Sequence, residues 1–127
     1  KNFLKTLEIG AGLGEHLNYE KLNDDQKKNY YALDIRENLL KYLSKEHPLV
    51  KSILGDCEKK LDFEDNFFDR IIMSHVLEHI VNPEEFIFEA AAYLLSEEDL
   101  ISTGWSIVEI LDELNLINDF ELSKNGG

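Results

Sequence analysis

The chain has 127 residues, of which 43% are hydrophobic and 31% charged, and its 13 basic and 26 acidic side chains give a net charge of −13. This length suits one domain with its own core, expected over residues 1–127, and the acidic balance argues against nucleic acid and membrane partners, which attract cationic surfaces. No apolar run approaches the roughly 18 residues of a membrane span, no signal-peptide pattern is seen and Cys57 is the single cysteine, so we expect a cytoplasmic protein without an internal disulfide.

The first half of the chain alternates apolar runs with amphipathic stretches. Short apolar runs at 6–9 and 30–33 predict buried strands, the first followed by a glycine turn and the second by an aspartate. Helices are expected over 15–22 and 37–45, the latter because three leucines share one helical face. Pro48 ends the second of these helices, since proline cannot continue the backbone hydrogen bonding.

The second half continues the alternation. An acidic, polar connection at 58–66 separates two apolar runs, and Pro83 marks a helix start because proline is favoured at the first helical position. Strands that alternate with helices of about ten residues indicate an α/β fold, with a parallel sheet covered on both faces. We expect further strands at 50–54, 68–73, 100–102 and 120–122, and further helices at 85–95 and 107–116.

The first strand ends in the run LEIGAGLGEHL, whose glycines suit a tight turn against a bound ligand. A dinucleotide fingerprint, G-x-G-x-x-G, would need a third glycine where Glu15 stands; the third glycine is instead Gly14. Glu8 precedes the first glycine by two residues, and a carboxylate there would repel a pyrophosphate. The turn therefore favours a ligand that carries positive charge.

Two more acids stand at the ends of the following strands. Asp34 closes the second strand, where it is placed to accept hydrogen bonds from ribose hydroxyls, and Asp56 closes the third. Any one of these acids is equally well explained as a helix cap, but three in phase with the glycines favour a nucleoside site. S-adenosylmethionine is a nucleoside ligand with a cationic sulfonium and ammonium.

The segments LEIGAGLGEHL, ALDI and GDCEKKLDFEDNFFDRIIMSHVLEHI resemble the class I S-adenosylmethionine-dependent methyltransferases, particularly the small-molecule group. The resemblance covers residues 5–104. It implies a Rossmann-like, doubly wound, mostly parallel sheet in a three-layer α/β/α sandwich. It also implies transfer of a methyl group to an O, N or C of a small-molecule acceptor, with S-adenosylhomocysteine as the product.

The same resemblance implies a set of cofactor-binding residues. Glu8 would orient the methionine end and Asp34 would hold the ribose. Ile35 would flank the adenine, while Asp56 would meet its amino group with the Cys57 backbone beside it. The complete implied set is Glu8, Gly10, Ala11, Gly12, Gly14, Asp34, Ile35, Asp56, Cys57, Ser74 and His75.

The run SHVLEHI contains the pattern H-x-x-E-H, which on spacing alone indicates two zinc ligands and a base. The preceding strand runs directly into His75, and Pro83 begins a new helix soon after His79. Barely one helical turn remains to present the pair, so we expect no metal site. The resemblance instead places Ser74 and His75 near the reactive methyl group, with His75 as the candidate general base and His79 in a structural role.

Other functions remain open at this point. The chain is short after residue 104 compared with the resembled family, which favours a non-catalytic S-adenosylmethionine-binding or scaffold domain as the main alternative. A nicotinamide-dependent oxidoreductase and a zinc hydrolase are weaker alternatives.

Overall fold

The computed structural model describes residues 5–59, 61–64, 67–74, 76, 79–82, 85–86, 89 and 119–123. In chain order these residues form β1 (Thr6–Ile9), α1 (Glu15–Glu20), α2 (Asp24–Lys28), β2 (Tyr30–Asp34), α3 (Glu37–Glu46), β3 (Lys51–Leu54), β4 (Arg70–Ser74) and β5 (Asp119–Ser123).

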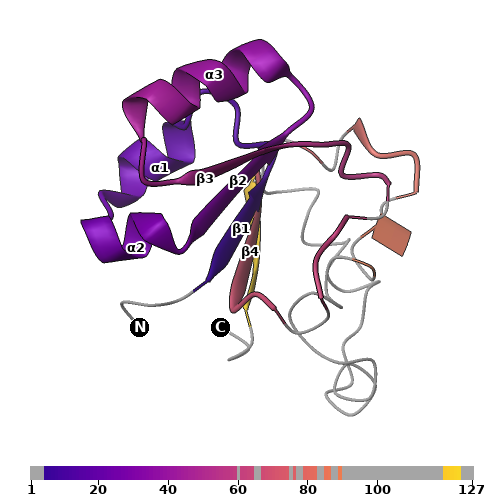
Figure 1. Ribbon diagram of the computed structural model, residues 1–127. Helices are drawn as coiled ribbons and strands as arrows, with labels where there is room; N and C mark the ends of the chain where they lie inside the picture. The colour runs from indigo at the N-terminus through magenta and orange to yellow at the C-terminus, as the bar shows by residue number, and fades with distance from the viewer. Residues whose placement is uncertain are drawn as a thin grey trace.

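The strands form one sheet in the order β3-β2-β1-β4-β5. The first four are parallel, and β5 runs antiparallel to β4. Helices α1, α2 and α3 all lie on one face of this sheet (Figure 1). The predicted α/β fold with a mostly parallel sheet is thus confirmed.

Both faces of the central strands are buried, because successive side chains of a strand point to opposite sides. Tyr30 and Ala32 of β2 pack with Leu17 of α1 and Leu43 of α3. A second core cluster lies on the other face of the sheet. It comprises Leu7, Ile9, Leu33, Phe68, Ile71, Met73 and Phe86. The sheet therefore carries an apolar core on each side.

A polar cluster fixes α1 to the sheet. The Arg70 guanidinium donates to both carboxylate oxygens of Glu20, at 2.8 and 2.9 Å, and to the Thr6 hydroxyl at 3.1 Å. Burial alone would raise the pKa of Glu20, but the hydrogen bonds from Arg70 and His16 lower it below its ordinary value. The partly buried carboxylate is therefore held in its charged form.

The helix expected over 15–22 ends at Glu20 and is followed by a helix that was not predicted. Lys21 adopts a left-handed conformation, with φ of 54°, which closes α1. The Asn23 side chain then accepts from the Gln26 N–H while the Gln26 side chain accepts from the Asn23 N–H. This capping box starts α2, which has only five residues and no buried side chain, so no apolar periodicity marks it in the sequence.

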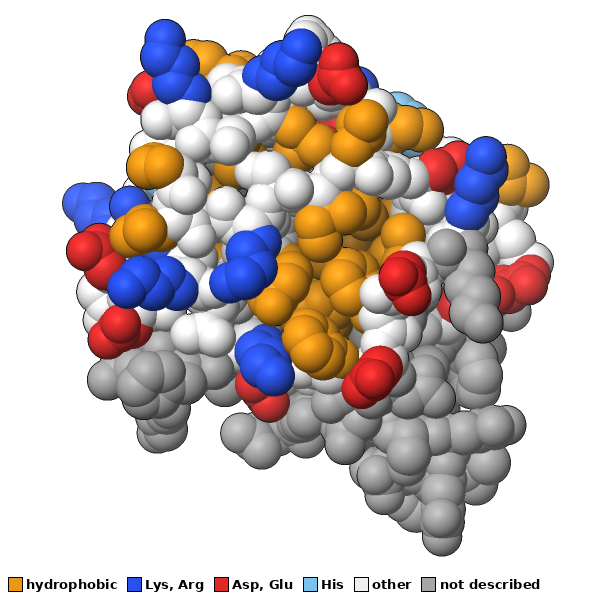
Figure 2. Space-filling view, in the orientation of Figure 1, with side chains coloured by type: hydrophobic (Ala, Val, Ile, Leu, Met, Phe, Trp, Pro, Cys, Tyr) orange, Lys and Arg blue, Asp and Glu red, His pale blue; other side chains and the backbone are white. Residues whose placement is uncertain are grey.

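Two strands begin later than expected, β3 at Lys51 and β4 at Arg70. The residues before β4 instead belong to an aromatic cluster, in which the fully buried Phe68 packs edge-on against Tyr31 and Phe63. Hydrophobic side chains gather in one surface patch on the side of the molecule shown in Figure 2. Phe63 and Phe67 pack against the core cluster that contains Phe68 and do not line the cavity described below.

The remaining expected elements lie partly within the described residues. The strand expected at 120–122 is confirmed as β5, and the described residues Glu85, Phe86 and Glu89 are helical, as the helix expected over 85–95 requires. The rest of that helix, the strand at 100–102 and the helix at 107–116 lie outside the described residues. Within the part of the chain that is described, no helix has the length and apolarity to cross a membrane.

Candidate functional site

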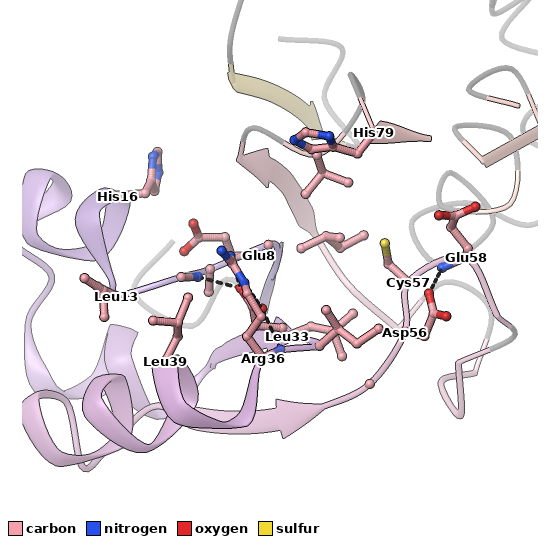
Figure 3. A pocket seen from close by; sticks show the side chains of 18 of the residues that line it. Glu8, Leu13, His16, Leu33, Arg36, Leu39, Asp56, Cys57, Glu58 and His79 are labelled. Atoms are coloured by element: carbon pink, nitrogen blue, oxygen red, sulfur yellow. Dashed lines mark hydrogen bonds and ion pairs between the residues drawn. The ribbon is translucent and has the colours of Figure 1, made fainter. Parts of the chain in front are cut away.

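A cavity of about 660 Å³ opens at the carboxyl ends of the parallel strands (Figure 3). Its lining comes from the segments that follow β1, β2, β3 and β4. The lining residues are 8–13, 15–16, 33–36, 39, 55–58, 76 and 79–80. Because β1 connects to β2 on one side while β4 lies on its other side, the cavity sits where the strand order reverses. Ligands of open α/β sheets bind at this position.

The loop after β1 forms one wall with bare backbone. The backbone is left-handed at its three glycines, with φ of 78° at Gly10, 59° at Gly12 and 89° at Gly14. Residues other than glycine adopt this conformation only at an energetic cost. The N–H groups of Gly10 and Ala11 both donate to the Leu33 carbonyl, which ties the loop to β2. Gly14 does not line the cavity: it caps α1, and a Cβ there would lie 3.5 Å from the His47 ring.

The Asp34 carboxylate lies buried at the end of β2, where backbone and side-chain donors surround it. The Gly12 N–H donates to Oδ2 and the Arg36 N–H to Oδ1, each at 2.9 Å. The Arg36 guanidinium adds two further bonds at 2.9 Å, one to each oxygen. Burial alone would raise the pKa of Asp34, but these donors lower it below its ordinary value. Asp34 is therefore a carboxylate at neutral pH.

Glu8 reaches the cavity from within β1 and is fully buried. The Tyr30 hydroxyl, which lies on the same face of the sheet, donates to Glu8 Oε1 at 2.6 Å. Burial and the nearby Glu8 carboxylate both raise the pKa of Tyr30, so its hydroxyl keeps the proton that it donates. Tyr30 thereby fixes the direction of the Glu8 carboxylate.

The opposite wall follows β3 and carries the cysteine. The Asp56 carboxylate accepts the Glu58 N–H at 2.9 Å, which shapes this turn, and Cys57 between them is half-buried. Burial, with Asp56 and Glu58 as lesser causes, raises the pKa of the Cys57 thiol to about 11. Ile35, which follows β2, is 62% exposed and also lines the cavity.

The raised pKa predicts that Cys57 reacts slowly with iodoacetamide. Only the thiolate reacts, and at about pH 8 its fraction is roughly a hundredfold below that of an ordinary cysteine. Since the thiolate gains population as pH rises toward about 11, the alkylation rate should climb close to tenfold for each pH unit up to that value. Mass spectrometry over time measures the rate, with free cysteine as the control. A rate that already levels off near pH 9 would contradict the shift.

The structure gathers most of the predicted site residues around the cavity but not all of them. Gly14 is the N-cap of α1, and its N–H donates to the Ala11 carbonyl within the loop. Ser74 ends β4, the strand that leads into the cavity wall, and His75 lies outside the described residues. The predicted residues that line the cavity are Glu8, Gly10, Ala11, Gly12, Asp34, Ile35, Asp56 and Cys57.

Sequence reasoning missed Arg36 and did not anticipate that His79 lines the cavity. Arg36 follows Asp34 by two residues, and alternate residues of an extended segment point the same way, so the spacing alone could have paired them. His79, which we expected to be structural, is exposed and lines the cavity. Its backbone N–H donates to the Val76 carbonyl at 2.9 Å. The described residues contain no group of three or more potential metal ligands, although His75 and Glu78 are not among them.

A family model described as "Methyltransferase domain" matches residues 7–99. Among solved structures, a SAM-dependent methyltransferase from Aquifex aeolicus is similar, with 25% identity, a TM-score of 0.62 and coverage of 75% of this chain and 53% of that one. The trans-methyltransferase CalH in complex with SAH gives 26% identity, a TM-score of 0.63 and coverage of 74% and 30%. No curated protein matches significantly.

A more distant structure supports the fold alone. An S-adenosylmethionine-dependent methyltransferase from Mesorhizobium loti shares 18% identity, with a TM-score of 0.61 and coverage of 72% of this chain and 42% of that one. The chain thus spans about half the length, or less, of each of these structures.

Proposed function

Because the chain belongs to the family of methyltransferase domains, we propose that it transfers a methyl group from S-adenosylmethionine to an O, N or C of a small-molecule acceptor. The observation that carries this proposal is the cavity at the strand-order reversal, where a glycine loop faces carboxylates from three successive strand ends. The CalH structure, which holds SAH, supports the choice of an adenosyl ligand over a dinucleotide. A cytoplasmic location remains a prediction.

The residues around the cavity fit the parts of this cofactor. Asp34 offers a buried carboxylate for the ribose hydroxyls. Glu8, oriented by Tyr30, offers negative charge for the ammonium of the methionine end. Asp56 and the Cys57 backbone would meet the adenine edge, with Ile35 against its face. These are the roles that the family resemblance implies, and the position of each residue at the cavity supports them.

When bound, the cofactor supplies an activated methyl group on a positively charged sulfur. The chain's own residues then contribute mainly by holding the two reactants in line and excluding water. A general base is needed only for an acceptor that must lose a proton. His75 remains the predicted base, and among the described residues that follow β4, His79 is a histidine that lines the cavity.

Ligand titration with thermal unfolding tests the proposed binding. S-adenosylmethionine and S-adenosylhomocysteine should each raise the melting temperature, because a ligand at a hundred times its Kd adds about 2.7 kcal/mol of stability. NAD and zinc serve as matched negative ligands for the oxidoreductase and hydrolase alternatives. Stabilisation by NAD or zinc, with no response to either adenosyl compound, would refute the proposal.

Turnover separates an enzyme from a binding or scaffold domain. Incubation with S-adenosylmethionine and a panel of small amines, hydroxy compounds and carbon acids should release S-adenosylhomocysteine above the rate without acceptor. Binding without release on any acceptor class would favour the scaffold function instead.

A further inference from the structure

Arg36 occupies the carboxylate that the proposed function assigns to the ribose. Its side chain donates from Nε to Asp34 Oδ1 and from Nη2 to Asp34 Oδ2, both at 2.9 Å. This is a two-pronged ion pair of the kind that arginine forms best with carboxylates. Figure 3 shows the Arg36 side chain beside the cavity, near Leu33 and Leu39. Among the described residues that line the cavity, it is the only lysine or arginine.

The ion pair leaves Asp34 with no acceptor position to spare. Its two oxygens already accept four hydrogen bonds, from the N–H groups of Gly12 and Arg36 and from two guanidinium nitrogens. An ionised carboxylate has about four lone-pair sites. Ribose hydroxyls that bind here must also donate to this carboxylate. The two backbone donors are fixed by the loop and strand end, so the guanidinium is the group that must give way.

The surroundings allow Arg36 to move. Its side chain is 57% exposed, whereas that of Asp34 is 2% exposed, so only one partner of the pair is held by packing. An exposed arginine loses side-chain entropy when it is held in one geometry and is screened by solvent, and both effects reduce the net strength of such a pair. Glu15 lies nearby as a second anionic neighbour: a Cβ placed at Gly12 would lie 3.5 Å from Glu15 Oε1 and 3.9 Å from Arg36 Nη2. A displaced guanidinium thus keeps a carboxylate within reach.

We propose that Arg36 determines the affinity and ribose specificity of the site by competing with the ribose hydroxyls for the Asp34 carboxylate. This inference rests on the proposed function. In the unliganded protein Arg36 holds the acceptor positions, and an adenosyl ligand binds by exchanging two guanidinium N–H groups for its hydroxyls. A ligand without both hydroxyls cannot complete the exchange.

We call Asp34 open when the Arg36 guanidinium is not bonded to it. The apparent affinity for the ligand is the intrinsic affinity multiplied by the fraction of molecules in which Asp34 is open. If the pair is as weak as other ion pairs with exposed side chains, about 15–40% of molecules should be open, so removing the side chain should tighten S-adenosylhomocysteine binding by about 2-fold to 6-fold. This direction is unusual for a residue that lines a ligand cavity, since truncation of a ligand-contacting side chain weakens binding. The sign of the effect therefore distinguishes competition from contact.

Isothermal titration with S-adenosylhomocysteine tests the inference on wild type, Arg36→Ala and Lys41→Ala. Lys41 is the matched control: it lies on α3 and pairs with Glu37 at 3.5 Å, and its loss removes the same charge away from the cavity. We expect tighter binding for R36A and unchanged binding for K41A. Arg36→Gln should show a smaller gain, which keeps the test valid if R36A does not fold.

Salt provides a second readout that a structural role would not move. Raising the salt from about 0.05 to about 0.5 M screens the exposed ion pair, so the advantage of R36A over wild type should shrink. Equal or weaker binding by R36A, or an advantage that is constant with salt, would overturn the role of Arg36. Failure of every variant, wild type included, to bind an adenosyl compound would instead overturn the proposed function.

Discussion

Replacement of Asp34 with alanine is expected to weaken S-adenosylhomocysteine binding by about 1–3 kcal/mol, or roughly 5-fold to 150-fold in Kd. The buried carboxylate is the acceptor placed for the ribose hydroxyls, and its removal leaves those hydroxyls without a partner in a site shielded from water. The change also leaves the Gly12 N–H without its acceptor, which loosens the glycine loop. Isothermal titration measures the loss, and circular dichroism verifies the fold.

The control for this variant is Asp62→Ala, because Asp62 is an exposed acid outside the cavity and its loss changes the net charge equally. Its affinity should match wild type. The double variant D34A/R36A adds a stricter comparison. If Arg36 acts by occupying Asp34, removing Arg36 should bring no gain once Asp34 is gone, and the two effects will not add. Unchanged affinity in D34A would show that the ribose lies elsewhere.

The sequence predicted those parts of the fold and site whose signals are local. Three of the four residues 6–9 are apolar or strand-favouring and the run is followed by glycines, and both the strand and the positive φ of Gly10 and Gly12 were observed. The acids at strand ends were also found at the cavity, because parallel strands bring their carboxyl ends to one edge. Spacing along the chain is sufficient for such features.

The missed features depend on contacts between distant residues or on competing local signals. Tyr30 reads as one more apolar strand residue, yet its hydroxyl meets Glu8 on the neighbouring strand. The link from Arg70 to Glu20 likewise depends on how α1 packs across the sheet, which no periodicity specifies. At Asn23 the capping box was present in the sequence, but no helix was predicted between residue 22 and the strand at 30–33.

These contacts suggest how the acidic cavity is kept stable without a ligand. A buried carboxylate is costly unless donors surround it. Here Tyr30 donates to Glu8, and the loop and Arg36 donate to Asp34. Fixed donors such as Tyr30 orient a carboxylate for the ligand, whereas the mobile donor Arg36 holds the place that the ligand takes.

Replacement of Glu8 with alanine is expected to give the largest loss of affinity for S-adenosylhomocysteine. Glu8 is the carboxylate placed for the ligand ammonium, and charge-assisted hydrogen bonds of this kind contribute about 1.5–3 kcal/mol, or roughly 10-fold to 150-fold in Kd. Methylthioadenosine lacks the ammonium and carboxylate of the methionine end, so its affinity should change far less. Titration of both ligands against wild type and E8A measures the difference.

The same substitution should lower the free energy of unfolding by about 1–3 kcal/mol, because it leaves the fully buried Tyr30 hydroxyl without its acceptor. Glu8→Gln separates the two effects: the amide oxygen can still accept from Tyr30, while the negative charge is lost. We expect E8Q to retain most of the stability, measured by urea unfolding, and still to bind S-adenosylhomocysteine weakly. Tyr30→Phe should do the reverse, losing about 1 kcal/mol of stability with a smaller loss of affinity than E8A. If E8A weakens methylthioadenosine as much as S-adenosylhomocysteine, Glu8 supports the shape of the cavity and does not hold the ammonium.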